Sequence, residues 1–153
     1  MTTYQIRVEY LGTNFVGWQF QKNGLSIQEV LESALSQYLK ENIRVIGSGR
    51  TDSGVHASEQ SAHFKTKNKI NNIGIFLNAV NFFLKKHPVS ILNIHKRSNN
   101  FHARHSAKER VYKYFIVNRP SSLAIDKNKA WHIKKKTRYK IDEKGRYNFK
   151  RNT

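Results

Sequence analysis

The sequence predicts an α+β fold: a ferredoxin-like β-α-β-β-α-β unit, with an antiparallel sheet that carries two helices on one face. Two stretches with helical spacing of apolar residues, 26–40 and 71–86, are separated by short segments with strand-like patterns. Their order along the chain is that of the split β-α-β arrangement. With 153 residues, the chain has room for one domain with a core and part of another.

The first strand and the first helix are predicted from two different periodicities. In residues 3–11 apolar side chains alternate with polar ones, which indicates a half-buried strand. An aromatic loop or short strand follows at 15–21. Ser26, with Glu29 three residues later, forms a capping-box pattern before a helix that we expect to end near residue 40. Apolar residues recur along it at helical spacing, and we assign them to the core.

The remaining strands and the second helix of the unit are also predicted from their residue patterns. Residues 43–46 read as a short strand that leads into a glycine-rich loop, and 61–66 as the next strand. A second helix begins at residue 71 or 72 and continues to about 86. Pro88 stops it, because proline cannot continue the hydrogen-bond ladder. Residues 89–94 complete the unit as its last strand.

Three segments make up the expected domain organisation. Residues 1–98 form the α/β domain that carries the glycine-rich loop. Residues 99–133 are a linker and the start of a second, incomplete α/β domain, with a strong strand at 110–118 and a short apolar island at 130–133. Residues 134–153 are basic and poor in apolar residues, so we predict a disordered tail.

Charge is the strongest global feature. The net charge is +18, and residues 134–151 contribute nine lysines and arginines against two acids, which leaves +11 on residues 1–133. Such an excess makes a nucleic acid the expected partner, with a merely solvated basic surface as the alternative. There is no cysteine, no apolar run of membrane-spanning length and no apolar signal core at the start. We expect a cytoplasmic protein with no membrane partner.

The glycine-rich loop at 47–57 is the candidate catalytic element. It contains three glycines and Asp52, one of only three aspartates in the chain. Arg50 lies two residues before Asp52, and a nearby positive charge favours the ionised carboxylate. A charged carboxylate in a turned loop suits nucleophilic or general-base chemistry. The alternative is a glycine-rich hairpin with an exposed salt bridge.

Other groups of residues give weaker evidence for a functional site. The seven histidines show no zinc-like spacing, so no metal site is predicted. A basic stripe that binds the nucleic-acid backbone is possible, and its candidate residues are Arg50, Arg104, Arg110 and Lys113. Three aromatic residues are candidates for stacking on a base, although an aromatic residue taken alone is more often part of the core: Trp18, Phe101 and Tyr112.

Four motifs, in order, resemble the TruA-type tRNA pseudouridine synthases. Residues 49–57, GRTDSGVHA, are similar to the family signature GRTDxGVHA. Residues 15–21, FVGWQFQ, resemble FxGWQxQ, and residues 101–107, FHARHSA, resemble FHARxSA. Residues 110–114, RVYKY, resemble RxYxY. The resemblance covers about residues 3–133.

The resemblance implies a reaction and a set of residues. Family members isomerise uridine to pseudouridine in the tRNA anticodon stem-loop, at tRNA positions 38, 39 and 40, without cofactor or metal. By match to the motifs, Asp52 is the nucleophile that attacks the flipped uridine at C1′ or C6. Arg50 pairs with Asp52 and holds the flipped state, and Tyr112 stacks on the uracil. His56 and Arg104 are expected to support the site or contact RNA.

The resemblance covers only part of the length of the family members. Family members are longer, work as homodimers and have a second α/β half, whereas the match here stops near Ile133. A truncated or frame-shifted product is the expectation from this length. The second function that the sequence allows is therefore an inactive fragment that acts only as a basic RNA-binding module.

Overall fold

The structure is a computed structural model, and it describes residues 1–135, 139–141 and 147–149. It divides into two compact units, Met1–Arg110 and Val111–Thr153. The first unit thus includes residues 99–110 together with the domain predicted at 1–98. None of the helices in the described residues is both long enough and apolar enough to cross a membrane.

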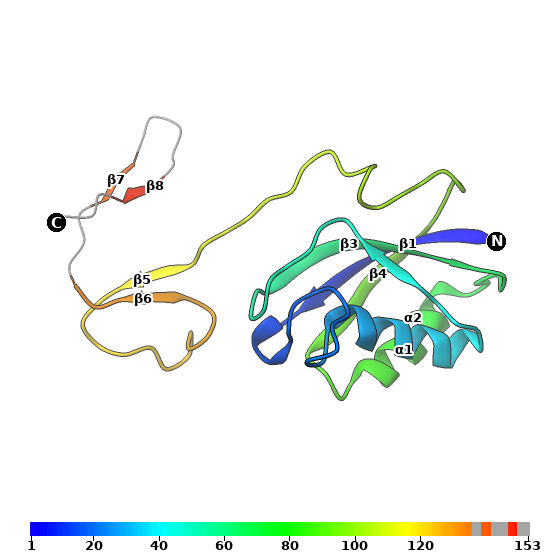
Figure 1. The fold of residues 1–153 in the computed structure, drawn as a ribbon, viewed down its shortest axis with the longest axis horizontal. Coiled ribbons are helices and arrows are strands. Elements are labelled where there is room, and N and C mark those ends of the chain that lie inside the picture. The colour runs from blue at the N-terminus through cyan, green and yellow to red at the C-terminus, as the bar shows by residue number, and fades with distance from the viewer. Residues whose placement is uncertain (136–138, 142–146, 150–153) are drawn as a thin grey trace. The chain divides into compact units, whose positions relative to one another are not determined.

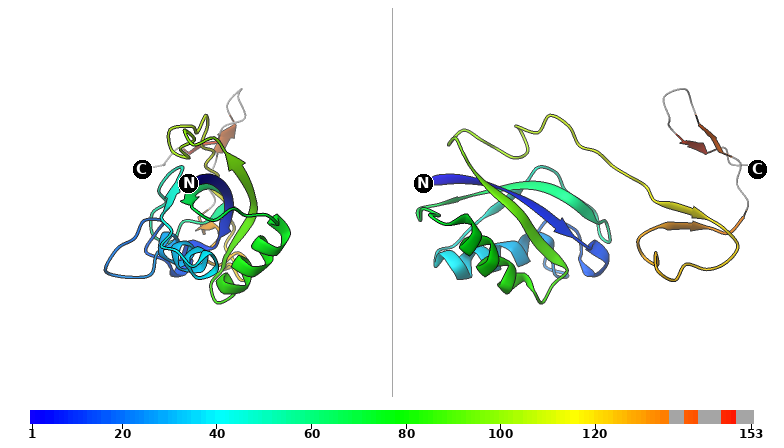
Figure 2. Two further views of the ribbon diagram at one scale, coloured as in Figure 1. Left: turned by 90° about the vertical axis from the view of Figure 1, so that its right-hand side faces the viewer. Right: turned by 180° about the vertical axis from the view of Figure 1, so that it is seen from behind.

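The first unit is a four-stranded antiparallel sheet with both helices on one face (Figures 1 and 2). The strand order is β2-β3-β1-β4, so the first strand lies inside the sheet and β2 and β4 form its edges. The predicted ferredoxin-like β-α-β-β-α-β unit is confirmed. Its elements are β1 (Thr2–Tyr10), α1 (Ile27–Leu39), β2 (Val45–Gly47), β3 (Ala57–Thr66), α2 (Ile73–Leu84) and β4 (Val89–Arg97), with a short 3-10 helix, η1, at Gly12–Asn14.

The two helices begin where the sequence predicts. The Ser26 hydroxyl accepts a hydrogen bond from the Glu29 backbone N–H at 3.2 Å, and the Asn72 side chain accepts one from the Ile75 N–H at 3.0 Å. Each cap satisfies a backbone donor that has no partner within the helix. β3 and β4 are longer than expected, because pairing with β1 extends both of them past their apolar segments into polar residues.

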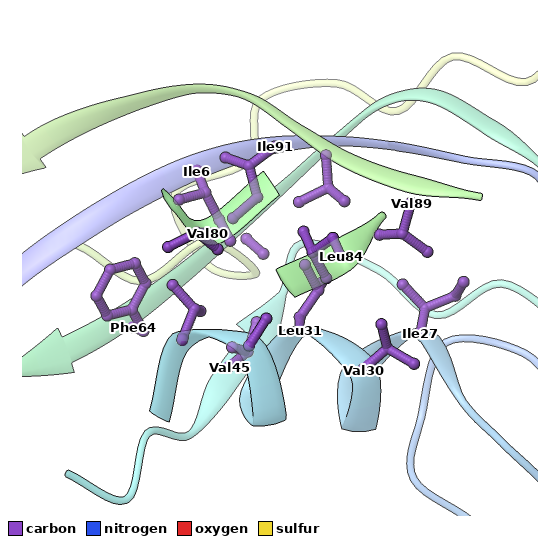
Figure 3. Packing of buried hydrophobic residues seen from close by; sticks show 14 of the residues in the cluster. Ile6, Ile27, Val30, Leu31, Val45, Phe64, Val80, Leu84, Val89 and Ile91 are labelled. Atoms are coloured by element: carbon purple, nitrogen blue, oxygen red, sulfur yellow. The ribbon is translucent and has the colours of Figure 1, made fainter. Parts of the chain in front are cut away.

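Apolar side chains fill the space between the sheet and the helices (Figure 3). Ile6 and Phe64 project from the two inner strands, and Leu31 and Val80 project from the helices; all four are fully buried. Burying an aliphatic side chain of this size contributes about 1.5–3 kcal/mol relative to leaving it exposed. The apolar stripes of both helices are therefore core, as predicted.

The opposite face of the sheet is partly covered by the chain that follows β4. His63 of β3 is 2% exposed, and its Nδ1 accepts a hydrogen bond from the Ala103 N–H at 3.1 Å. Phe101 packs edge-on against the His63 ring, with the ring centres 5.9 Å apart, and lies 5.6 Å under the Arg97 guanidinium. Residues 101–103 are thus fixed on the sheet face that carries no helix.

The second unit contains two small pairs of strands. β5 (Ile116–Asn118) and β6 (Trp131–Ile133) pair in parallel, and β7 (Tyr139–Ile141) and β8 (Tyr147–Phe149) pair antiparallel. The apolar island at 130–133 is β6. The predicted disorder of 134–153 falls mostly on residues outside the described part of the chain.

The strand expected at 110–118 is wrong for residues 110–115. Only Ile116–Asn118 is a strand, and no regular structure is assigned to the six residues before it. Their pattern suits a strand, but strands are stable only when the backbone groups pair with a neighbour. Within the described residues, 110–114 have no such neighbour.

Candidate active site

Asp52 lies in the loop that joins β2 to β3. The Asp52 carbonyl accepts a hydrogen bond from the Val55 N–H at 3.2 Å, and Gly54 has a φ of 80°, so the chain turns sharply just after the aspartate. A positive φ of this kind favours glycine. The Asp52 side chain is exposed to solvent. The loop thus presents a carboxylate on a turn whose conformation depends on a glycine.

Thr51, next to Asp52, is held by the body of the unit. Its carbonyl accepts a hydrogen bond from the Trp18 N–H at 3.0 Å. The Tyr10 hydroxyl donates to Gln60 Oε1 at 2.7 Å, so its 2.9 Å bond with Thr51 Oγ1 has the threonine as donor. Gln60 in turn donates to the Gly49 carbonyl at 2.9 Å. A buried polar network therefore fixes the backbone on both sides of Arg50.

The predicted aromatic segment at 15–21 packs directly under the loop. Gly17 has a φ of 115°, and a Cβ there would lie 2.6 Å from the Thr51 carbonyl oxygen. Ser53 Oγ donates to the Phe15 carbonyl at 3.1 Å. Two of the family-like motifs are thus in contact because glycine lets the two backbones approach each other.

His56 closes the loop. Its Nδ1 accepts a hydrogen bond from the Gly12 N–H at 2.9 Å, and the ring is half-buried. The structure therefore gives His56 a part in holding the loop, and its predicted contact with RNA stays a prediction.

Arg104 is brought next to the loop by another arginine. The Arg110 guanidinium donates to the Ser48 carbonyl from Nε at 3.1 Å and from Nη2 at 2.8 Å. The same Nη2 donates to the Arg104 carbonyl at 3.0 Å. Both arginine side chains are exposed. Asp52, Arg50, His56 and Arg104 consequently belong to one local structure.

The structure shows no ion pair between Arg50 and Asp52. Both side chains are exposed, and there an ion pair gains little free energy over hydration. Within the described part of the chain the ion pairs are Arg7 with Glu59 at 3.4 Å and Arg44 with Glu32 at 3.3 Å. The expected pairing is therefore absent from this structure, and the role of Arg50 toward a substrate stays a prediction.

Two histidines near Arg104 have lowered pKa values. Burial lowers the pKa of His63 below its ordinary 6.5, and the nearby His102 and Lys65 lower it further. Burial also lowers the pKa of His102, with contributions from His105 and Arg104. Both rings are therefore more readily neutral in the folded chain than in water.

The three aromatic candidates for base stacking differ in exposure. Trp18 is 3% exposed and packs near Tyr10, so it is part of the core and is not available to a base. Phe101 is half-buried against His63. Tyr112 is 66% exposed, which leaves its ring free to stack, and it belongs to the second unit.

Sequence reasoning missed two groups that hold the loop. The alternation in residues 3–11 places Tyr10 on the apolar face of a strand and assigns no role to its hydroxyl, which bonds Thr51 and Gln60. Gln60 fell just outside the strand predicted at 61–66, although β3 begins at Ala57. The available signal was Tyr10 at the end of its strand, because a buried tyrosine hydroxyl usually finds a hydrogen-bond partner.

Comparison with known proteins identifies the class. A family model described as tRNA pseudouridine synthase matches residues 6–106. This match includes the loop, the segment under it and Arg104. The chain belongs to the tRNA pseudouridine synthase family.

Individual relatives agree with the family model. The chain is 52% identical over 145 residues to "tRNA pseudouridine synthase A" of Pelagibacter ubique (strain HTCC1062), an alignment covering 95% of this chain and 59% of the relative. It is 47% identical over 131 residues to the protein of that name from Ehrlichia ruminantium (strain Gardel), covering 85% and 53%. For Ehrlichia canis (strain Jake), the identity is 46% over 132 residues, covering 86% and 54%. The chain thus spans between half and three-fifths of the length of these curated relatives.

Proposed function

We propose that this chain carries the nucleophile of a tRNA pseudouridine synthase, which isomerises uridine to pseudouridine in the tRNA anticodon stem-loop at positions 38–40. The observation that carries the proposal is the Asp52 loop. Its backbone is fixed at Gly49 and Thr51, while the carboxylate projects into solvent. A nucleophile needs this combination of a held backbone and an accessible side chain.

The reaction is an isomerisation and needs no co-reactant. The bond between C1′ and N1 of the uridine breaks, the uracil turns, and a bond forms between C1′ and C5. C5 loses its proton and N1 gains one, so the atoms balance. Asp52 supplies the electron pair that attacks C1′ or C6, and it is released when the new bond is complete. We assign to Tyr112 the stacking on uracil and the transfer of a proton.

Binding of the substrate rests on charge. Residues 1–133 carry a net +11, and Arg50 and Arg104 are exposed beside the loop. Arginines that neutralise phosphates release counterions and supply most of the sequence-independent affinity. Extruding the base costs a few kcal/mol, which these contacts offset. The tRNA anticodon stem-loop and a homodimeric assembly are part of this proposal.

One observation favours a second function. The Asp52 carboxylate is exposed, whereas electrostatic stabilisation of a transition state is largest where water is excluded. The second candidate is therefore a basic module that binds tRNA without converting uridine.

Incubation of the full chain with unmodified tRNA, followed by chemical mapping of pseudouridine, separates the two. We expect conversion by the wild type, and a rate at least about a thousandfold lower for Asp52→Asn, because the isostere lacks the nucleophilic charge. Asp126→Asn, which changes another exposed aspartate, serves as the matched control. Asp52→Asn should bind tRNA as tightly as the wild type or more tightly, since it removes a negative charge.

Two outcomes contradict the first candidate. Conversion by Asp52→Asn at the wild-type rate means that Asp52 is not the nucleophile. Binding of tRNA by the wild type without any conversion, over hours and with excess protein, supports the module that only binds.

A further inference from the structure

Arg110 lies on the loop without being one of its residues. Its guanidinium straddles a single carbonyl, that of Ser48, with two N–H groups, and reaches the Arg104 carbonyl with one of them. Backbone oxygens carry no net charge, so the arginine remains a full cation after forming these bonds. The planar fork of five donors allows one side chain to hold two separate backbone segments.

The position of Ser48 explains why such a bond matters. Gly47 and Gly49 flank it, and glycine leaves the backbone with the greatest conformational freedom. The Ser48 N–H donates to the Ser61 carbonyl at 2.7 Å, so β3 holds the backbone on one side of Ser48. Arg110 holds the other side. A Cβ on Gly49 would lie 3.6 Å from Arg110 Nε, so the arginine side chain also lies against the next residue of the loop.

We infer that Arg110 is a positioning residue that fixes the entry to the Asp52 loop and holds the Arg104 backbone against it. The sequence alone makes Arg110 a candidate phosphate contact, because it stands in a basic stripe. The geometry assigns three of its hydrogen bonds to backbone carbonyls instead. The effect on turnover rests on the proposed function, whereas the effect on the loop does not.

Amide hydrogen exchange of the full chain tests the loop directly. In Arg110→Gln, the amides of Ser48, Val55 and Trp18 should exchange roughly tenfold faster, since charge-assisted hydrogen bonds that restrain local opening are lost. The midpoint of global unfolding should stay unchanged. Arg110→Lys should lie between the two, because an ammonium group can hold one carbonyl but cannot reproduce the fork.

Arg119→Gln is the matched control. Arg119 is also exposed and donates to two backbone carbonyls, those of Ser121 and Ser122, at 3.2 and 3.1 Å. Its replacement should leave the amides of the Asp52 loop unaffected. Equal exchange at Ser48, Val55 and Trp18 in Arg110→Gln and wild type would overturn the inference.

Kinetics on tRNA give a second readout. A positioning role predicts a kcat about tenfold lower in Arg110→Gln with KM nearly unchanged, partly restored in Arg110→Lys. A phosphate contact instead predicts a higher KM, an unchanged kcat and a salt slope reduced by about 1, and this pattern would overturn the inference. If even the wild type fails to convert uridine, the proposed function fails, while hydrogen exchange still decides the role of Arg110.

Discussion

The loop around Asp52 and the stretch 111–115 both carry residues predicted for catalysis, but their backbones are held differently. Hydrogen bonds link the loop to four other segments, through Trp18, Tyr10, Gln60 and Arg110. The stretch with Tyr112 is exposed, and Tyr114 is 86% exposed. A glycine-rich loop is thus held in place when donors reach its carbonyls, whereas strand-like residues stay irregular where, as at 110–114, no neighbouring strand pairs with their backbone.

The largest effect is expected from Gly17→Ala. The added Cβ meets the Thr51 carbonyl oxygen at 2.6 Å, and the φ of 115° is strained for any other residue. The free energy of unfolding should fall by about 2–4 kcal/mol, and the Asp52 loop should shift. Chemical denaturation measures this. Gly74→Ala in α2 is the control and should be neutral or slightly stabilising, because alanine favours a helix.

The polar network under the loop comes next. Tyr10→Phe removes the hydroxyl that bonds both Thr51 and Gln60, and Gln60→Met removes the donor to Gly49. Each should lower the free energy of unfolding by about 1–3 kcal/mol, since polar groups that remain buried lose their partners. The double variant should lose less than the sum of the two. Strict additivity in this double-mutant cycle would contradict a shared network.

A smaller effect concerns pH and the segment after β4. The pKa of His63 is lowered mainly by burial, so the unfolded chain binds a proton more readily than the folded chain. Stability should therefore decrease as the pH falls below about 6.5, through the lowered pKa of the folded state. His102, whose pKa is lowered too, acts in the same direction.

Unfolding midpoints measured between pH 5 and 8 test whether stability decreases as the pH falls. His63→Asn should flatten the profile, while keeping an acceptor for the Ala103 N–H. His95→Asn, on an exposed position of β4, should leave the slope as in the wild type. An unchanged slope in His63→Asn would assign the pH dependence to other groups.

The smallest effect is expected in the exposed stretch. Tyr114→Ser should change the free energy of unfolding by less than about 0.5 kcal/mol, because the side chain is almost fully solvated. Denaturant titration of Tyr114→Ser and Tyr10→Phe side by side measures the contrast between the exposed stretch and the Asp52 loop. A loss above 1 kcal/mol would show that the stretch packs against other residues in solution, and the contrast between the two regions would disappear.

Periodicity predicted most of the first unit correctly. The apolar stripes of both helices report burial directly, and the caps at Ser26 and Asn72 report local hydrogen bonds. The alternation in β1 predicted a half-buried strand, but Thr3 and Gln5 on its polar face are buried as well. The motifs were enough to select the Asp52 loop. The sequence could not predict contacts between residues that are far apart in the chain. The hydrogen bond from Arg110 to Ser48 spans 62 positions, and the residues around either one give no sign of the other.

The same limit explains the error at 110–115. A run such as RVYKY has the side-chain pattern of a strand, but the strand forms only if a neighbouring backbone is present. The pattern is local, whereas the partner is not. Residues 116–118 do form a strand, because Trp131–Ile133 lies beside them.

The inner position of β1 has a consequence for folding. This strand comes first along the chain, yet its two neighbours are β3, at Ala57–Thr66, and β4, at Val89–Arg97. It gains each sheet partner only when a long loop has closed, and each closure has an entropic cost that precedes the gain from pairing. During synthesis on a ribosome, one edge of β1 therefore stays open until Thr66 has emerged and the other until Arg97 has emerged, and in this interval the chain is most exposed to pairing with other strands.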